Sequence, residues 1–353
     1  MKLNYLKNAF VGIFGLVLFS SCSSTKMLYT NIDVLRPAKV SFATDANNLL
    51  IVNNTVVQPS HLGHSTRLLN ENEQNVDIAT DSLSMLLVSA LSEEIEKKDF
   101  FLNTNLMYET VNTSSDFNVA NLLRSYQVSN LSTQHQADVI LSLNKLKVID
   151  LMEEYFLTDT RLYFLALDAV YESHWSIQYP NRSQTDTIVY TDTVHWNASS
   201  YSRRRLFADF PKRSDALMNG ALYVGRKSVN RFIPYWEEQE RFFFDSKNKM
   251  MQQGMNLVYE RDWKGAIKAW EEALSANNNK DKKLQVHASN NLAVAYEITG
   301  ELGKAIGYMS AAIEVYSKTA SSNDSSLQIM SDYYNDLIRR KNDAALLEEQ
   351  LGK

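Results

Sequence analysis

The sequence predicts an α+β layer domain followed by an all-α domain of repeated helix pairs. Residues 162–179 alternate apolar and polar side chains over a long run, which is typical of a strand with one buried face. From about residue 250 the apolar spacing becomes that of amphipathic helices. The chain has 353 residues, is 44% hydrophobic and 22% charged, and can therefore bury a substantial core.

The N-terminal part of the α+β domain contains two short strand candidates. Residues 38–43 and 49–57 are rich in β-branched side chains, and Pro37 precedes the first of them. The polar composition of residues 59–77 predicts a long loop after these strands.

A helix is the clearest element that follows this loop. Residues 83–95 carry one continuous apolar face at helical spacing, formed by Leu83, Leu86, Leu87, Ala90, Leu91 and Ile95. A further helix is expected near 117–126, and residues 138–150 read as another strand.

An antiparallel hairpin closes the sheet of this domain. Pro180 and Asn181 end the long strand over 162–179 and turn the chain. Residues 187–196 then return as a second strand with apolar residues on one face. Strands, a helix and then a hairpin predict an α+β layer architecture.

The N-terminus has the features of a secretory signal peptide. Lys2 and Lys7 precede an apolar run that is too short to span a bilayer, and small residues follow it. The sequence Leu-Phe-Ser-Ser-Cys ends at Cys22, the chain's only cysteine, and resembles the lipobox of bacterial lipoproteins. That resemblance implies cleavage before Cys22 and its lipidation. Phe19 departs from the leucine that most lipoboxes carry.

The stretch between the two domains carries a second resemblance. A helix is expected over 214–233, and Pro234 interrupts it. Pro234, Trp236 and Arg241 then precede three phenylalanines. Together with the lipobox and the early strands, this pattern resembles a family of uncharacterised Gram-negative envelope lipoproteins. The resemblance implies an α+β domain followed by appended helical repeats, and it implies no activity.

The C-terminal part contains two copies of one spacing pattern. Small and bulky residues alternate over a helix pair in both copies, as in tetratricopeptide repeats. The first copy is Gly254, Leu257, Ala266, Trp270 and Ala273, and the second is Ala293, Tyr296, Ala305, Met309 and Ala312. A polar insert over 277–283 separates the copies, and a plain helical bundle with alanines at its contacts would fit the same residues.

Two repeats do not bury a core by themselves, so a further helix is expected. Residues 326–351 can supply it through Leu327, Met330, Tyr334, Leu337, Leu346 and Leu347. The expected domains are thus a signal peptide over 1–21, a lipidated tether over 22–36, an α+β domain over 37–245, and tetratricopeptide-like repeats with a terminal helix over 246–353.

Composition narrows the function classes. The net charge is −5 without a dominant basic face, so nucleic acid is not expected as a partner. Glycine-rich phosphate loops and the GxSxG nucleophile motif do not occur in the sequence. We expect no cofactor.

The sequence contains one group of residues that could be considered as a metal site. His61 and His64 form the sole close pair, and Glu71 and Glu73 follow in the same loop. Gly63 argues against a helix that would align the pair, and loop histidines without a third fixed ligand are usually solvated. We therefore expect no metal.

The long hairpin offers candidate groups for catalysis or sugar binding. His174 and Trp175 are echoed by His195 and Trp196 in the second strand. Aromatic packing across the strands explains the tryptophans without a ligand, although an indole pair could also stack on a sugar. Asp168 and Glu172 share one strand face but are about 13 Å apart at 3.3 Å per residue, too far for a glycosidase pair. No catalytic residue is expected.

Two functions remain after these exclusions. The first is a non-enzymatic envelope adaptor, lipid-anchored in the bacterial outer membrane on its periplasmic side, with a protein partner bound to its repeats. The second is a glycan-binding protein or hydrolase with a site in the α+β domain. In the first case the first helix of each pair would line a groove for an apolar peptide or helix. The expected groove residues are Met251, Met255, Val258, Tyr259, His287, Asn290, Val294 and Glu297.

Overall fold

The computed structural model describes residues 27–109, 111–112, 114–278, 280–318 and 325–352. They form two compact units, and each unit gathers segments that are distant in sequence. The α+β unit comprises 37–235 and the residues from 346 onward, and the helical unit comprises 27–36 and 236–345. Among the described residues, no helix combines the length and apolar character that crossing a membrane requires.

Strand β2 (Asn48–Asn53) is an interior strand of the seven-stranded sheet in the α+β unit. It pairs in parallel with β5 (Asn103–Met107) on one side and with β6 (Val139–Leu157) on the other. Its residues 49–52 are apolar without alternation because both faces are covered. The strand expected over 49–57 is therefore present but shorter, whereas the one expected over 38–43 is absent.

The predicted hairpin is confirmed as part of an antiparallel meander. Strand β6 pairs with β7 (Leu162–Gln178), and β7 pairs with β8 (Thr185–Ser200). Trp175 lies opposite Ile188. Because side chains alternate between faces with a period of two, this register puts Trp175 and Ile188 on the same face of the sheet.

The polar loop expected over 59–77 contributes a short edge to the same sheet. Strand β3 (His64–Arg67) lies parallel to the second half of β6, and β4 (Gln74–Asn75) pairs with β3. β2 and β3 thus follow one another along a single edge of β6. In the gap between them, the side-chain amide of Gln58 accepts from the backbone N–H of Val148 at 2.7 Å and donates to its carbonyl at 2.8 Å.

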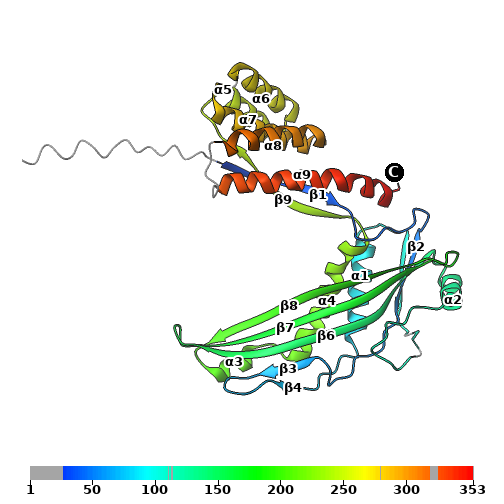
Figure 1. The fold of residues 1–353 in the computed structure, drawn as a ribbon. Helices are drawn as coiled ribbons and strands as arrows, with labels where there is room; N and C mark the ends of the chain where they lie inside the picture. The colour runs from blue at the N-terminus through cyan, green and yellow to red at the C-terminus, as the bar shows by residue number, and fades with distance from the viewer. Residues whose placement is uncertain (1–26, 110, 113, 279, 319–324, 353) are drawn as a thin grey trace, which may run out of the picture. The chain divides into compact units, whose positions relative to one another are not determined.

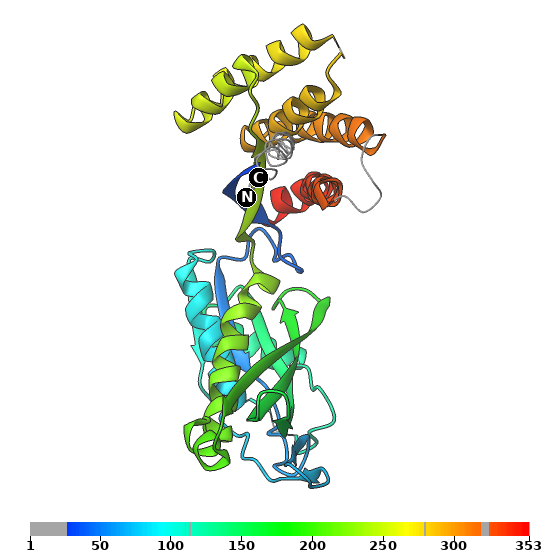
Figure 2. The ribbon, with the colours of Figure 1, turned by 90° about the vertical axis from the view of Figure 1, so that its left-hand side faces the viewer.

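Helices cover both faces of this sheet. α1 (Leu83–Lys97) and α4 (Arg213–Phe232) lie side by side on one face (Figures 1 and 2). They approach closely because residue 225 is glycine, where a Cβ atom would lie 2.3 Å from the carbonyl oxygen of Leu87. The amphipathic pattern predicted both helices correctly.

Two shorter helices differ from expectation. The helix expected near 117–126 begins later, as α2 (Ser125–His135), and packs on the face opposite α1. Three consecutive arginines at 203–205 begin α3 (Arg203–Asp209), which has no counterpart among the predicted elements. Ser202 caps α3 by accepting from the backbone N–H of Arg205.

The helical unit is built around a two-stranded ribbon. Strand β1 (Met27–Arg36) pairs with β9 (Tyr235–Phe244). Residues 27–36, expected to belong to the tether, are therefore strand. The helices packed with the ribbon are α5 (Lys249–Tyr259), α6 (Trp263–Asn277), α7 (Lys282–Ile298), α8 (Leu302–Ser317) and α9 (Ser325–Gln350).

The small and bulky residues that predicted the helix pairs do meet. A Cβ atom at Gly254 would lie 2.1 Å from Nε1 of Trp270, so only glycine lets α5 and α6 approach this closely. Ala293, Ala305 and Met309 are completely buried in the same core. An all-helical C-terminal region of packed helices is thus confirmed.

The boundaries between the units differ from the expected junction at 245. The contacts divide the chain after Arg36, after Tyr235 and after Ala345. Strand β9 therefore belongs with the helices, and the end of α9 belongs with the α+β unit. There Gln350 accepts from the backbone N–H of Ala38 at 2.9 Å.

Candidate functional site

The expected groove residues of α5 differ in exposure. Met251 and Met255 are buried in the core of the helical unit, and Val258 is half-buried. Tyr259 is 70% exposed at the end of the helix. Only Tyr259 of these four presents most of its surface to solvent, and contact of any of them with a partner stays a prediction.

The expected groove residues of α7 lie on the helix face that packs against the protein's own strand β9. The side chains are His287, Asn290, Val294 and Glu297, and all four are buried. The amide of Asn290 donates to the carbonyl of Phe242 at 2.9 Å. Its neighbour Asn291 donates to the carbonyl of Phe244 at 3.0 Å and accepts from the N–H of Phe244 at 2.8 Å. An extended segment of the chain thus occupies this helix face.

A bidentate ion pair fixes β9 further along the same face. Arg241 donates to both carboxylate oxygens of Glu297, at 2.8 and 2.9 Å, and both side chains are buried. Burial alone would lower the pKa of Arg241, but hydrogen bonds and the charge of Glu297 outweigh it and raise this pKa. Tyr333 and Arg340 of α9 also donate to Glu297. Glu297 is therefore fully engaged inside the protein.

The ion-pair network continues from β9 to β1. Asp336 of α9 accepts hydrogen bonds from Arg241 and from Arg36, the last residue of β1. Burial raises the pKa of Asp336, but its arginine partners outweigh burial and lower it. Arg36 also donates to Glu237 at 2.8 Å. One feature of the sequence indicates this network. Arg36 and Arg241 are each the only arginine of their strand, and each stands at an inward position.

A cavity of about 610 Å³ opens beside the N-terminus of α7. The ring of His287 lines it and stacks on Phe244, with centroids 4.3 Å apart and planes 11° apart. Burial, aided by the positive charge of Lys283, lowers the pKa of His287 to about 4, so the imidazole is neutral at pH 7. The remaining lining residues are Met27, Lys282, Lys283, Val286, Tyr316 and Ser326.

The α+β unit contains a buried charged cluster that the sequence did not reveal. Nδ1 of His64 contacts Asp150, whose other carboxylate oxygen accepts from Nε of Arg213 at 2.5 Å. The side chains of His64 and Asp150 have no solvent exposure. Arg213, the first residue of α4, also donates to Thr66 at 2.7 Å. The cluster joins β3, β6 and α4.

The structure separates the histidine pair considered as a metal site. His61 is exposed in the loop, whereas His64 is buried against Asp150. Glu71 and Glu73 are also exposed. Within the ranges that the structure describes, no group of three His, Cys, Asp or Glu side chains is placed to hold a metal ion.

The polar face of the hairpin carries two separate histidine–carboxylate pairs. His174 lies 2.8 Å from Glu172, and His195 contacts Asp168 across the strands. Both pairs are partly or largely exposed, and no described residue joins them.

The two tryptophans of the hairpin belong to the core. Trp175 is buried, and its Nε1 donates to Ser173 at 2.9 Å. Trp196 is partly buried against the α4 layer, where Gly220 leaves room for its ring. An indole platform for a sugar is therefore not available at these positions.

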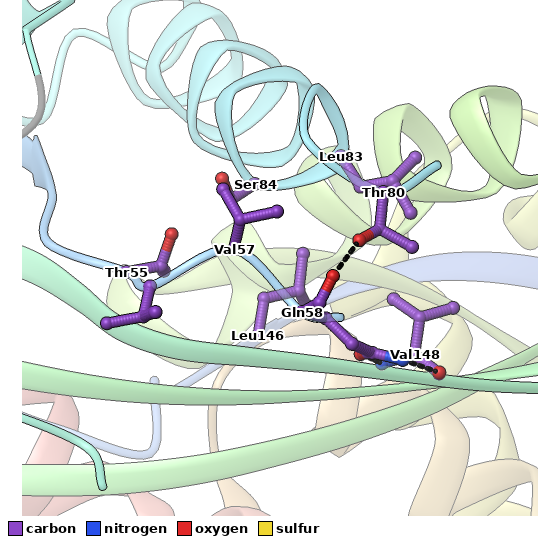
Figure 3. Close-up of a pocket in the computed structure, with 9 residues that line it drawn as sticks. Thr55, Val57, Gln58, Thr80, Leu83, Ser84, Leu146 and Val148 are labelled. Carbon is purple, nitrogen blue, oxygen red and sulfur yellow. Dashed lines mark hydrogen bonds between the residues drawn. The ribbon is translucent and has the colours of Figure 1, made fainter. Parts of the chain in front are cut away.

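A small cavity lies between α1 and the edge of β6 (Figure 3). Thr80 donates to the carbonyl of Gln58 at 2.8 Å at its wall, and Leu146 and Val148 form its floor. Its volume of about 10 Å³ has room for about one water molecule. This cavity is too small for an organic ligand.

Cys22 lies outside the described residues, so its lipidation stays a prediction. The comparisons with known proteins concern the rest of the chain. A family model described as "Domain of unknown function (DUF8603)" matches residues 46–244, and one described as "Domain of unknown function (DUF6340)" matches 252–339. The first spans the α+β unit through β9, and the second runs from α5 into α9.

One similar solved structure is described as "Crystal structure of uncharacterized protein". It is 10% identical with a TM-score of 0.21, and the alignment covers 54% of this chain and 94% of that chain. No curated protein matches the chain. The family match covers more than half of the residues, and the chain therefore belongs to the family described as domain of unknown function DUF8603.

Proposed function

We propose that the protein is a non-enzymatic adaptor, anchored by lipid at Cys22 in the bacterial outer membrane and facing the periplasm. In this proposal the helical unit is a tetratricopeptide-like scaffold that holds an extended segment and presents a surface to a protein partner. The observation that carries the proposal is the binding of β9 on α7. Asparagine amides bind the strand backbone and an arginine–carboxylate pair fixes its register, which is how peptide-recognition modules hold extended ligands.

Because β9 already occupies this face of α7, we propose that the partner surface lies elsewhere on the helical unit. The aromatic side chains that stay exposed in the helical unit are better candidates, because large aromatics are enriched at protein interfaces. Tyr29 and Trp236 are exposed on the β1–β9 ribbon, and Tyr259 is exposed on α5. The hydrogen bond between Asn31 and Glu238 joins alternate positions of the two strands and so puts Tyr29 and Trp236 on one face.

Photo-cross-linking in cells tests this proposal. Benzoylphenylalanine in place of Trp236 should yield one discrete adduct with an envelope protein, and Cys22→Ala should abolish the adduct by releasing the protein from the membrane. The matched control replaces Lys268, an exposed residue of α6. Absence of an adduct at Trp236, or an equal set of adducts at both positions, would contradict the adaptor proposal. Unchanged membrane fractionation of Cys22→Ala would contradict the anchor.

A further inference from the structure

The cavity beside α7 has the size and the lining of a small-ligand site. Its volume of about 610 Å³ lies within the range of about 300–1,000 Å³ that is typical of such sites. We call Met27, Phe244, Val286 and the ring of Tyr316 its apolar wall. An acyl chain placed against this wall would remove apolar surface from water on both partners, which favours binding.

One polar side chain of the cavity is buried without a partner. His287 is 6% exposed, and its ring nitrogens make no hydrogen bond with any residue that the structure describes. Stacking on Phe244 fixes the ring plane. A neutral imidazole carries one N–H donor. A ligand oxygen in the cavity would satisfy it.

The rim of the cavity is positively charged. Lys282 and Lys283 begin α7, are exposed, and form no ion pair with the described part of the chain. The carboxylate of Asp281, the residue before them, already accepts from the N–H of Leu284 as the helix cap. Of the described residues that line the cavity, two carry a positive charge and none carries a negative one, and the positive end of the helix dipole adds to them.

We propose that this cavity binds a single-chain anionic lipid. The acyl chain lies along the apolar wall, and the anionic head is placed at the rim, near Lys282, Lys283 and His287. The apolar wall favours the chain, and the two unpaired cations, with the N–H of the imidazole as a further donor, favour the negative head.

If Cys22 is lipidated as proposed, the membrane is a source of such a ligand. This step alone rests on the proposed function. Met27 of the apolar wall is five residues from Cys22. An extended chain spans at most about 3.5 Å per residue, so the wall would lie within about 17 Å of the membrane anchor. A lipid leaving that membrane would have a short path to the cavity.

Photo-labelling of the full chain in nanodiscs of neutral phosphatidylcholine tests the proposal. The probe is a fatty acid with a diazirine in its chain, and cross-linked residues are located by mass spectrometry. We expect labels on Met27, Val286 and Tyr316. Unlabelled laurate should compete, whereas dodecyltrimethylammonium, with the same chain and the opposite charge, and acetate, a head without a chain, should not.

Matched variants separate specific binding from background partitioning. Lys282→Glu with Lys283→Glu should reduce labelling of the wall at least about fivefold, because two exposed charge pairs are together worth about 1 kcal/mol. Lys264→Glu with Lys268→Glu makes the same charge change on exposed positions of α6 and should have no effect. Labels outside the cavity, equal loss in both double variants, or equal competition by the alkyl cation would overturn the proposal. None of these outcomes depends on Cys22.

Discussion

Two aspartates of the α+β unit have the same kind of partner and differ in burial. Asp150 contacts His64 and Arg213 without solvent exposure, whereas Asp168 contacts His195 at the surface. Breaking a buried pair leaves an uncompensated charge inside the protein, but breaking an exposed pair lets water replace it. The sequence could not show this difference, because the residues of the buried cluster are far apart in the chain.

We expect Asp150→Asn to lower the free energy of unfolding by about 3–5 kcal/mol, because Arg213 would lose its buried counter-charge. Asp168→Asn is the matched control and should cost less than about 1 kcal/mol. Urea unfolding followed by near-ultraviolet circular dichroism measures both. Equal losses in the two variants would show that the buried cluster contributes no more than a surface pair.

His287 makes stability depend on pH. Its pKa falls from 6.5 to about 4 on folding, mainly through burial, so between these values the unfolded chain binds more protons. Its contribution is complete above pH 6.5 and is lost as pH falls toward 4, by up to about 3 kcal/mol. His287→Phe keeps a ring on Phe244 and removes the titration. The stability difference between wild type and this variant should therefore shift by that amount between pH 7 and 4.

The control for this pH effect is Asn256→Ala, which changes an exposed side chain of α5 that does not titrate. Its stability curve should run parallel to that of the wild type over the same pH range. A parallel curve for His287→Phe as well would show that the imidazole titrates normally in the folded protein.

At the level of elements, periodicity predicted the helices and strands whose own side chains form a continuous apolar face. The helices α1 and α4, the strands of the hairpin and their faces follow from the spacing of residues such as Leu87, Leu165 and Tyr171. Strand β9 was missed because the residues before its phenylalanines, with Glu237, Glu238 and Glu240, read as a charged loop. Its strand form depends on β1 and α7, which are remote in sequence.

The hydrogen bonds between α7 and β9 give a prediction at this level. Asn291→Ala would leave the buried N–H and carbonyl of Phe244 unpaired and should cost about 2–4 kcal/mol in unfolding free energy. Asn256→Ala, on the exposed side of α5, should change it by less than about 0.5 kcal/mol. Hydrogen exchange should also show faster exchange at Phe244 in the first variant only. Unchanged exchange there would mean that other contacts hold β9 in place.

For the whole molecule, the sequence predicted the order of the two folds but not how the chain is divided between them. The expected junction at 245 follows the change from period-two to helical spacing, and the match to the first family model also ends at residue 244. The contacts nevertheless assign β1 and β9 to the helical unit. The local pattern of apolar residues indicates where one element ends and another begins. The unit to which an element belongs depends instead on its tertiary partners, such as Glu297 for Arg241.

This division predicts that residues 246–353 do not complete a core by themselves. Without β9 the fragment lacks the three phenylalanines at 242–244 and leaves Glu297 buried beside Arg340 and Tyr333 without Arg241. We expect the fragment to bind the dye ANS and to lack a cooperative thermal transition.

The ten-residue peptide Tyr235–Phe244 should bind to this fragment, reduce the dye signal and restore near-ultraviolet circular dichroism. The same peptide with Arg241→Gln should bind at least about tenfold more weakly, since losing a buried charge partner costs about 2 kcal/mol or more. A scrambled peptide is the control. A fragment that melts cooperatively without the peptide, or binds both peptides equally, would show that the helices form a complete domain and that β9 is only attached to it.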